Sequence, residues 1–373
     1  MNNKNYNSGR LRTGRRSRNR FVSSLLYIDH RKSSIAIIAS ILALAIIVCI
    51  FFAAFYEESI PSFIPQATTS TKKPDGEPSQ NVGKKYPYAT VTSKTDFVAS
   101  KGGNDLSDIY LYSEYAILIR LSDMTTIAHQ DADAVIYPAS MTKVMTVVTA
   151  IDIIENLDDR YLITREVLNR IPQGASTAWL SSHIGSYVSV RDLLYGISYM
   201  SGADSVICLI DYFGLTEEEF VILMNAKADE IGLENTNFGG AIGMDDEFNQ
   251  TTCRDVAAIM AYAMENPLCQ ELFGGLAYKL DYVEMTYYNS TLSKTLTNMG
   301  TNPDKVLGDD YTLVAAKSGL EDEAGYCLVS YIKNDVTDEY FVLVTAKASR
   351  SSSYPSNKNT ILDMKILFNE FLP

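Results

Sequence analysis

Ser140 and Lys143 are spaced so that they could act together as a nucleophile and its base. Pro138 predicts the entry to a helix, and the apolar residues of 144–154 continue it. Ser140 is therefore expected in the first turn, where free backbone N–H groups and the helix dipole favour an anion. The two side chains then share one face, roughly 5–6 Å apart at Cβ. This arrangement suits an attacking hydroxyl, its base and backbone donors for an oxyanion.

The Ser-x-x-Lys spacing alone is weak evidence, because the chain contains it three times. Ser70 and Lys73 lie in a Pro/Thr-rich stretch, and Ser330 and Lys333 lie in a run typical of a strand. Only Ser140 opens an apolar helix. The sequence therefore favours Ser140 as the candidate nucleophile.

The N-terminal quarter does not read as globular. Residues 1–32 carry nine Lys or Arg and one acid, whereas residues 33–56 are uncharged and mostly apolar. The apolar run is long enough for a hydrocarbon core of about 30 Å and exceeds the apolar part of a cleavable signal peptide. We therefore expect a basic cytoplasmic tail at 1–32 and a transmembrane helix at 33–56. A Pro/Ser/Thr-rich linker at 57–94 then leads to one domain over 95–373.

The charge of the chain and its expected topology limit the kinds of partner that it could have. The basic flank predicts a single-pass protein whose N-terminus is cytoplasmic and whose catalytic domain is extracellular or periplasmic. The net charge of the whole chain is −13, so the part beyond the basic tail is strongly acidic. An acidic domain offers no footprint for nucleic acid, and none is expected as a partner.

The cysteines and histidines do not indicate a metal site. His129 and His183 lack a nearby partner at zinc-ligand spacing, so a zinc peptidase is not expected, and no metal or cofactor is predicted. The cysteines beyond the apolar run sit among apolar residues without Cys-x-x-Cys spacing, which favours buried free thiols over disulfides. These cysteines are Cys208, Cys253, Cys269 and Cys327.

The periodicity of apolar residues predicts an α+β domain whose sheet joins the N- and C-terminal parts. The expected elements are a hairpin over 115–121 and 125–129, helices over 140–155, 190–199, 204–213, 216–231 and 251–265, a strand over 311–317, a hairpin over 325–333 and 340–348, and a helix over 357–371.

Three short motifs occur in order, Ser140-Met141-Thr142-Lys143, Ser201-Gly202-Ala203 and Lys317-Ser318-Gly319. This set resembles the serine-type D-alanyl-D-alanine carboxypeptidases of the peptidase S11 family, the low-molecular-mass penicillin-binding proteins. The resemblance covers about 95–373. It extends to Tyr137–Lys143, Val190–Gly196, Phe220–Phe238 and Ala324–Ser330. It implies the fold shared with serine β-lactamases, an antiparallel sheet with flanking helices and a helical subdomain.

The resemblance also implies roles for individual residues. Ser140 would attack the D-Ala-D-Ala peptide bond of a peptidoglycan stem peptide, and β-lactams would acylate it covalently. Lys143 would be a neutral base, its pKa lowered by burial and by Lys317, and Ser201 would relay a proton to the leaving amine. Lys317-Ser318-Gly319 would hold the terminal carboxylate. The N–H groups of Ser140 and Leu320 would form the oxyanion hole.

Several positions depart from the family pattern. Ala203 stands where Asn is usual, Ser318 replaces Thr but keeps a hydroxyl, and Leu320-Glu321 changes the pocket wall and adds a negative charge. A catalytically weak penicillin-binding protein is therefore the alternative. A β-lactamase is the less favoured enzyme. Glu166 lies in a string similar to one in class A β-lactamases. In those enzymes the string follows the second motif, whereas here Glu166 precedes Ser201. We expect Glu166 to face solvent in a short helix.

Overall fold

The computed structural model describes residues 97–292, 310–349 and 358–372. The predicted tail, transmembrane helix and linker over 1–94 lie outside these residues. Among the helices of the described part, none is both long and apolar enough to cross a membrane.

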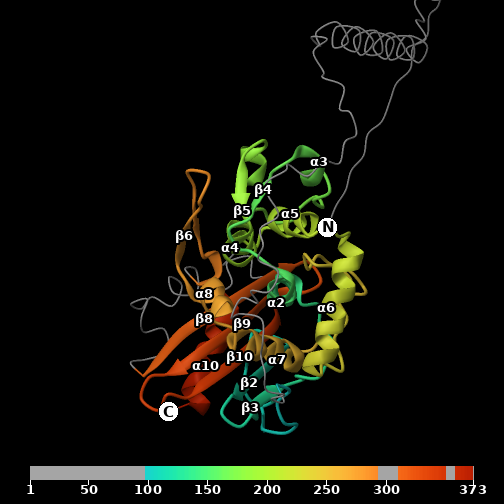
Figure 1. Cartoon of the computed structure of the whole chain (residues 1–373). Coiled ribbons are helices and arrows are strands. Elements are labelled where there is room, and N and C mark those ends of the chain that lie inside the picture. Colours follow the sequence, from blue (N-terminus) through green and yellow to red (C-terminus); the bar gives the residue numbers. More distant parts are fainter. Residues whose placement is uncertain (1–96, 293–309, 350–357, 373) are drawn as a thin grey trace, which may run out of the picture. The chain divides into compact units, whose positions relative to one another are not determined.

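A six-stranded sheet joins the N- and C-terminal parts of the domain (Figure 1). Its strands follow the order β1 (Asn104–Asp105), β3 (Thr125–Gln130), β2 (Tyr115–Arg120), β10 (Tyr340–Ala348), β9 (Gly325–Asn334) and β8 (Tyr311–Glu321). The pairs are antiparallel except β1 with β3. The β2–β10 pairing confirms the predicted joining of the two ends. β8 has one neighbour within this sheet, so its other edge is available to the site.

Helices cover both faces of the sheet, which explains the long apolar runs of its strands. Along β2, Ile117 and Ile119 belong to the core on the side of α7 (Cys253–Met264). The intervening Leu118 belongs to the core on the side of α10 (Lys358–Phe371). This alternation follows from the two-residue repeat of a strand.

The remaining elements lie between β3 and β8 in the sequence, and several gather away from the sheet. Figure 1 shows α3, α4, α5, β4 and β5 together at one end of the domain. This confirms the α+β class. The elements are η1 (Ala139–Met141), α2 (Thr142–Ile153), β4 (Arg160–Leu162), α3 (Arg165–Leu168), η2 (Leu180–His183), β5 (Tyr187–Ser189), α4 (Val190–Met200), α5 (Ala203–Tyr212), α6 (Glu217–Ile231), α8 (Pro267–Gly274), β6 (Ala277–Lys279) and β7 (Thr286–Tyr288).

Side-chain caps determine where the helices begin. Ser189 and Asp192 form a capping box at the start of α4, and Thr216 and Glu219 form another at α6. Thr252 caps α7 by accepting a hydrogen bond from the Asp255 N–H. These caps lie within about one residue of the predicted helix starts.

The prediction missed α8 and the β6–β7 hairpin, which it left as a polar region. Their sequence signals are short, although Asn266 and Pro267 do form a recognisable helix start.

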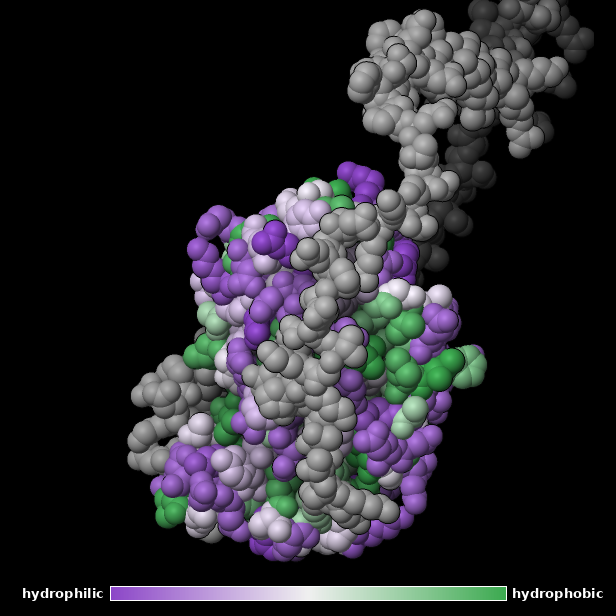
Figure 2. Space-filling model, in the orientation of Figure 1, coloured by the Kyte–Doolittle hydropathy of each residue, from purple (hydrophilic) through white to green (hydrophobic). Residues whose placement is uncertain are grey.

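The surface also departs from a simple polar pattern. Figure 2 shows hydrophobic residues on the side where α6 lies in Figure 1, and Ile222 and Leu223 of α6 are exposed.

Candidate active site

Ser140 and Lys143 are brought together at the junction of η1 and α2. The Lys143 Nζ lies 2.9 Å from the Ser140 Oγ and 2.5 Å from the carbonyl oxygen of Ile242. The predicted first helical turn is a 3₁₀ turn over Ala139–Met141 that continues directly into α2. The expected pairing of the two side chains is therefore present, with Ser140 just before the α-helix.

Two positive backbone angles mark this region. Ala139, which precedes Ser140, has φ 47°, and Ser201 has φ 56° and ψ 32°. Residues other than glycine rarely adopt this left-handed conformation, which costs about 1–3 kcal/mol and clusters at functional sites. Neither angle was predictable from the sequence, since neither position is a glycine.

The environment of Lys143 favours its neutral form near pH 7. The side chain is only 1% exposed, and burial lowers the pKa of its amine to about 7. The negative charges of Glu321 and Asp204 act in the opposite direction and raise this pKa. The expected lowering influence of Lys317 is not among the causes of the shift. Burial is therefore the largest cause of the lowered pKa of Lys143, and a pKa near 7 suits a general base.

We expect Glu321→Gln to move the acid limb of the acylation rate to lower pH. Removing this carboxylate removes an influence that raises the pKa of Lys143, so the amine loses its proton at lower pH. The measurement is the pH profile of the second-order rate constant for benzylpenicillin. Glu323→Gln is the matched control, because Glu323 lies on the turn just after β8 but is not among the causes of the shift in the pKa of Lys143. An acid limb that stays in place or rises in Glu321→Gln would contradict this explanation.

Lys317 connects the second motif to the third. Ser201 is the C-cap residue that follows α4, and Gly202 is the N-cap residue that precedes α5. The Lys317 Nζ donates to the Ser201 Oγ at 3.0 Å and to the carbonyl oxygen of Ser318 at 2.9 Å. Lys317 is 1% exposed, so its stem is packed inside the domain while its amine reaches the serine.

Gly319 lets β8 approach the nucleophile. A Cβ at this position would lie 2.8 Å from the Ala139 Cβ, 2.9 Å from the Pro138 oxygen and 3.1 Å from the Ser140 nitrogen. Only a glycine permits this approach without displacement of the backbone. β8 therefore contacts Ser201 through Lys317 and Ser140 through Gly319, and the three sequence motifs form one site.

The open edge of β8 also orients the Leu320 N–H. The Ser318 N–H donates to the Thr291 Oγ1 at 3.3 Å, away from the neighbouring strand β9. Backbone N–H groups two residues apart on a strand point to the same edge, so that of Leu320 also points off the open edge. The Ser140 nitrogen lies beside Gly319 at this same edge.

Ala203 and Asp204 clarify the departure in the second motif. Ala203 is fully buried at the first position of α5, and its N–H donates to the Ser176 oxygen at 2.7 Å. The Asp204 carboxylate accepts hydrogen bonds from the N–H groups of Ala178 at 2.7 Å and Leu180 at 3.0 Å. Asp204 thus holds the segment beside α5, and its side chain does not substitute for the missing Asn.

The competing motifs lie apart from this arrangement. Ser330 is buried within β9, and Lys333 pairs with Asp338 at 2.7 Å. Ser70 and Lys73 lie outside the described residues. Glu166 is exposed in α3, as expected.

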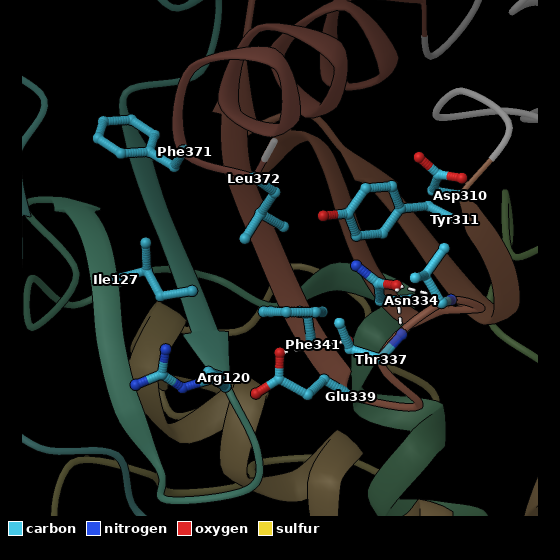
Figure 3. Close-up of a pocket in the computed structure, with 11 residues that line it drawn as sticks. Arg120, Ile127, Asp310, Tyr311, Asn334, Thr337, Glu339, Phe341, Phe371 and Leu372 are labelled. Atoms are coloured by element: carbon cyan, nitrogen blue, oxygen red, sulfur yellow. Dashed lines mark hydrogen bonds between the residues drawn. The ribbon is translucent and has the colours of Figure 1, made fainter.

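A pocket of about 380 Å³ lies elsewhere, between the C-terminal end of α10 and the sheet (Figure 3). Phe341, Phe371 and Leu372 supply apolar lining, while Arg120 and Glu339 stand near its rim. None of the motif residues lines this pocket. The candidate site is the group of motif residues at the open edge of β8, and the pocket lies apart from it.

The described cysteines and acidic residues add no metal chemistry. Cys208, Cys253, Cys269 and Cys327 are buried free thiols, which confirms the prediction for these four. In the ranges that the structure describes, no group of three or more His, Cys, Asp or Glu could hold a metal ion.

Comparison with known families agrees with the geometry. The profile of the D-alanyl-D-alanine carboxypeptidases, peptidase S11, matches residues 104–348. The chain belongs to this family. The S11 carboxypeptidase match spans the strands and helices that carry all three motifs, and it confirms the resemblance predicted from the sequence.

Individual relatives match over part of their length. The D-alanyl-D-alanine carboxypeptidase DacF of Bacillus subtilis is 28% identical over 246 residues, 63% of this S11 chain and 58% of the relative. The D-alanyl-D-alanine carboxypeptidase of Streptomyces sp. strain K15 is 31% identical, over 55% of this chain and 71% of the relative. The solved Streptomyces K15 DD-transpeptidase has the same fold, with a TM-score of 0.58 at 22% identity over 70% of this chain and 98% of that chain.

Proposed function

We propose that the protein is a serine-type D-Ala-D-Ala carboxypeptidase that acts on peptidoglycan stem peptides through an acyl-enzyme at Ser140. The observation that carries the proposal is the 2.9 Å contact between the Ser140 Oγ and the Lys143 Nζ, in surroundings that bring the pKa of Lys143 to about 7. A base with a pKa near the working pH combines a useful neutral fraction with a useful affinity for the proton.

The positions of the side chains support the following reaction. Lys143 takes the proton of the Ser140 hydroxyl while the Ser140 Oγ attacks the carbonyl carbon of the penultimate D-alanine. The N–H groups of Ser140 and Leu320 stabilise the oxyanion. The C–N bond then breaks, Ser201 gives its hydroxyl proton to the leaving amine, and Lys143 returns the proton it took from Ser140 to Ser201, so both groups regain their starting states. Water hydrolyses the ester, which returns Ser140 to its starting state.

The third motif supplies recognition of the substrate's end. Lys317 places a positive charge beside Ser201, and Ser318 adds a hydroxyl at the same edge of β8. A cation and a hydroxyl suit a terminal carboxylate, which accepts several hydrogen bonds. β-Lactams carry a carboxylate and a reactive carbonyl, and we expect them to acylate Ser140 as covalent inhibitors.

The test of this proposal is the release of free D-alanine from a diacylated peptide that ends in D-Ala-D-Ala. The purified residues 95–373 should release it, and Ser140→Ala should release none. The products also separate related activities, since the curated relatives include a D-alanyl-D-alanine endopeptidase from Escherichia coli. Release from cross-linked peptides alone, with none from linear peptides, would replace carboxypeptidase with endopeptidase.

A catalytically weak penicillin-binding protein stays the second candidate, and Ala203 is the observation that favours it. We expect Ala203→Asn to speed acylation by a few-fold to roughly a hundredfold, the range for one restored hydrogen bond to a neutral or charged partner. The measurement is the benzylpenicillin acylation rate of the two proteins. A faster wild type would show that the buried position cannot accept the amide productively.

We further propose that residues 33–56 anchor the protein in the membrane, with residues 95–373 outside. The uncharged length of 33–56 and the nine basic residues before it support this topology. Protease added to intact, wall-permeabilised cells should remove the domain. A domain that survives this treatment but is degraded after lysis would place it inside.

A further inference from the structure

Thr291 lies directly behind the third motif, although no sequence pattern singled it out. Its Oγ1 is 2.9 Å from the Ser318 Oγ and accepts a hydrogen bond from the Ser318 N–H at 3.3 Å. Thr291 is 2% exposed, whereas Ser318 is partly exposed, so Thr291 contacts Ser318 from the interior of the domain. One side chain therefore contacts both the backbone and the hydroxyl of Ser318.

The helical segment that carries Thr291, residues 290–292, is itself anchored. The Asn289 side-chain amide donates to the carbonyl oxygens of Phe273 at 3.2 Å and Gly275 at 3.0 Å. Its oxygen accepts a hydrogen bond from the Leu292 N–H at 3.0 Å. Asn289 is fully buried, so these contacts tie the segment after β7 to the end of α8. Thr291 consequently approaches Ser318 from a fixed support.

Ser318 has a particular need for such support. A threonine, which the family motif carries at this position, has a second heavy atom on Cβ that restricts its side-chain rotation. A serine hydroxyl lacks this restriction and rotates more freely. A hydrogen bond from a neighbouring hydroxyl can restore the orientation that the missing methyl group would have favoured.

We propose that Thr291 is a positioning residue that orients the Ser318 hydroxyl toward the terminal carboxylate of the substrate. This inference rests on the proposed function. The Thr291 O–H donates to the Ser318 Oγ, and the Ser318 O–H then donates to the carboxylate. Because each hydroxyl is both donor and acceptor, such a chain strengthens the final hydrogen bond to the anion.

The inference predicts a loss that depends on the carboxylate. Thr291→Val keeps the shape of the side chain and removes its hydroxyl, and we expect the second-order acylation rate with benzylpenicillin to fall roughly two- to tenfold, the range for one net hydrogen bond. With benzylpenicillin methyl ester, which lacks the free carboxylate, the same substitution should change the rate much less. Thr291→Ser should recover most of the loss. Thr286→Val is the matched control for the same exchange, because Thr286 is an exposed residue of β7.

A second arm tests the compensation directly. In a Ser318→Thr background, Thr291→Val should lower the acylation rate with benzylpenicillin less than it does in the wild-type background. The methyl group added at position 318 restricts rotation of that side chain on its own. An equal loss with the acid and the ester, or an equal loss in both backgrounds, would overturn the inference and leave Thr291 a packing residue. The proposed function fails separately, if the wild-type protein releases no D-alanine.

Discussion

Replacing Lys143 with Ala should slow acylation by benzylpenicillin roughly 10²- to 10⁴-fold, the usual contribution of a positioned general base. The Ser140 hydroxyl would lose the amine that lies 2.9 Å away, while the oxyanion donors and the Lys317 charge would remain. Non-covalent binding should therefore change little. Trapping with a fluorescent penicillin over a time course, in gel, measures the rate, and the dependence on its concentration separates binding from acylation.

The chain offers a control for this substitution. Lys333 has the same spacing from a serine as Lys143, but it lies on β9 and pairs with Asp338 on the surface. Lys333→Ala should therefore leave the acylation rate within about twofold of wild type, as is usual for surface substitutions. Equal effects of the two variants, or a Lys143→Ala protein with unchanged kinetics, would show that another group takes the proton of the nucleophile.

Gly319→Ala should reduce acylation by about 10²-fold or more, comparable to the loss of an oxyanion-hole donor. The new Cβ would lie 2.8 Å from the Ala139 Cβ and 2.9 Å from the Pro138 oxygen, closer than packed atoms allow. β8 would have to move away from η1, and the Leu320 N–H would move with it. The same trapping experiment measures this effect.

Gly240→Ala is the matched control for this exchange. A Cβ at Gly240 would meet only the Glu217 Oε1, at an ordinary contact distance of 3.4 Å. This variant should label at nearly the wild-type rate. Thermal unfolding of both proteins shows whether a loss reflects the site or the fold. A folded Gly319→Ala protein with wild-type kinetics would mean that β8 does not complete the oxyanion hole.

Much of the fold follows from patterns that the sequence displays locally. The helices were predicted from the spacing of their apolar residues, and the caps at Ser189, Thr216 and Thr252 explain why three of them begin close to the predicted positions. The sequence also predicted that strands from the two ends of the domain share one sheet, because short apolar runs typical of strands occur at both ends. The contact between Ser140 and Lys143, the proposed nucleophile and base, was predictable from their spacing on a helix.

The remaining features depend on contacts between distant segments, which no local pattern encodes. The positive φ angles of Ala139 and Ser201 arise from the packing around them, at residues that ordinarily avoid that region. Thr291 reaches Ser318 only because Asn289 fixes a segment 27 residues earlier in the chain. The opposing influence of Glu321 on the pKa of Lys143 likewise required the positions of both side chains.

The most direct test of the account is to locate the covalent adduct. Purified residues 95–373 would be incubated with benzylpenicillin, denatured and digested, and the peptides analysed by mass spectrometry. The account predicts one penicilloyl group, carried by the peptide that contains Ser140, and no adduct in Ser140→Ala. An adduct on Ser201 or on another residue, or full labelling of Ser140→Ala, would contradict the assignment of Ser140 as the nucleophile.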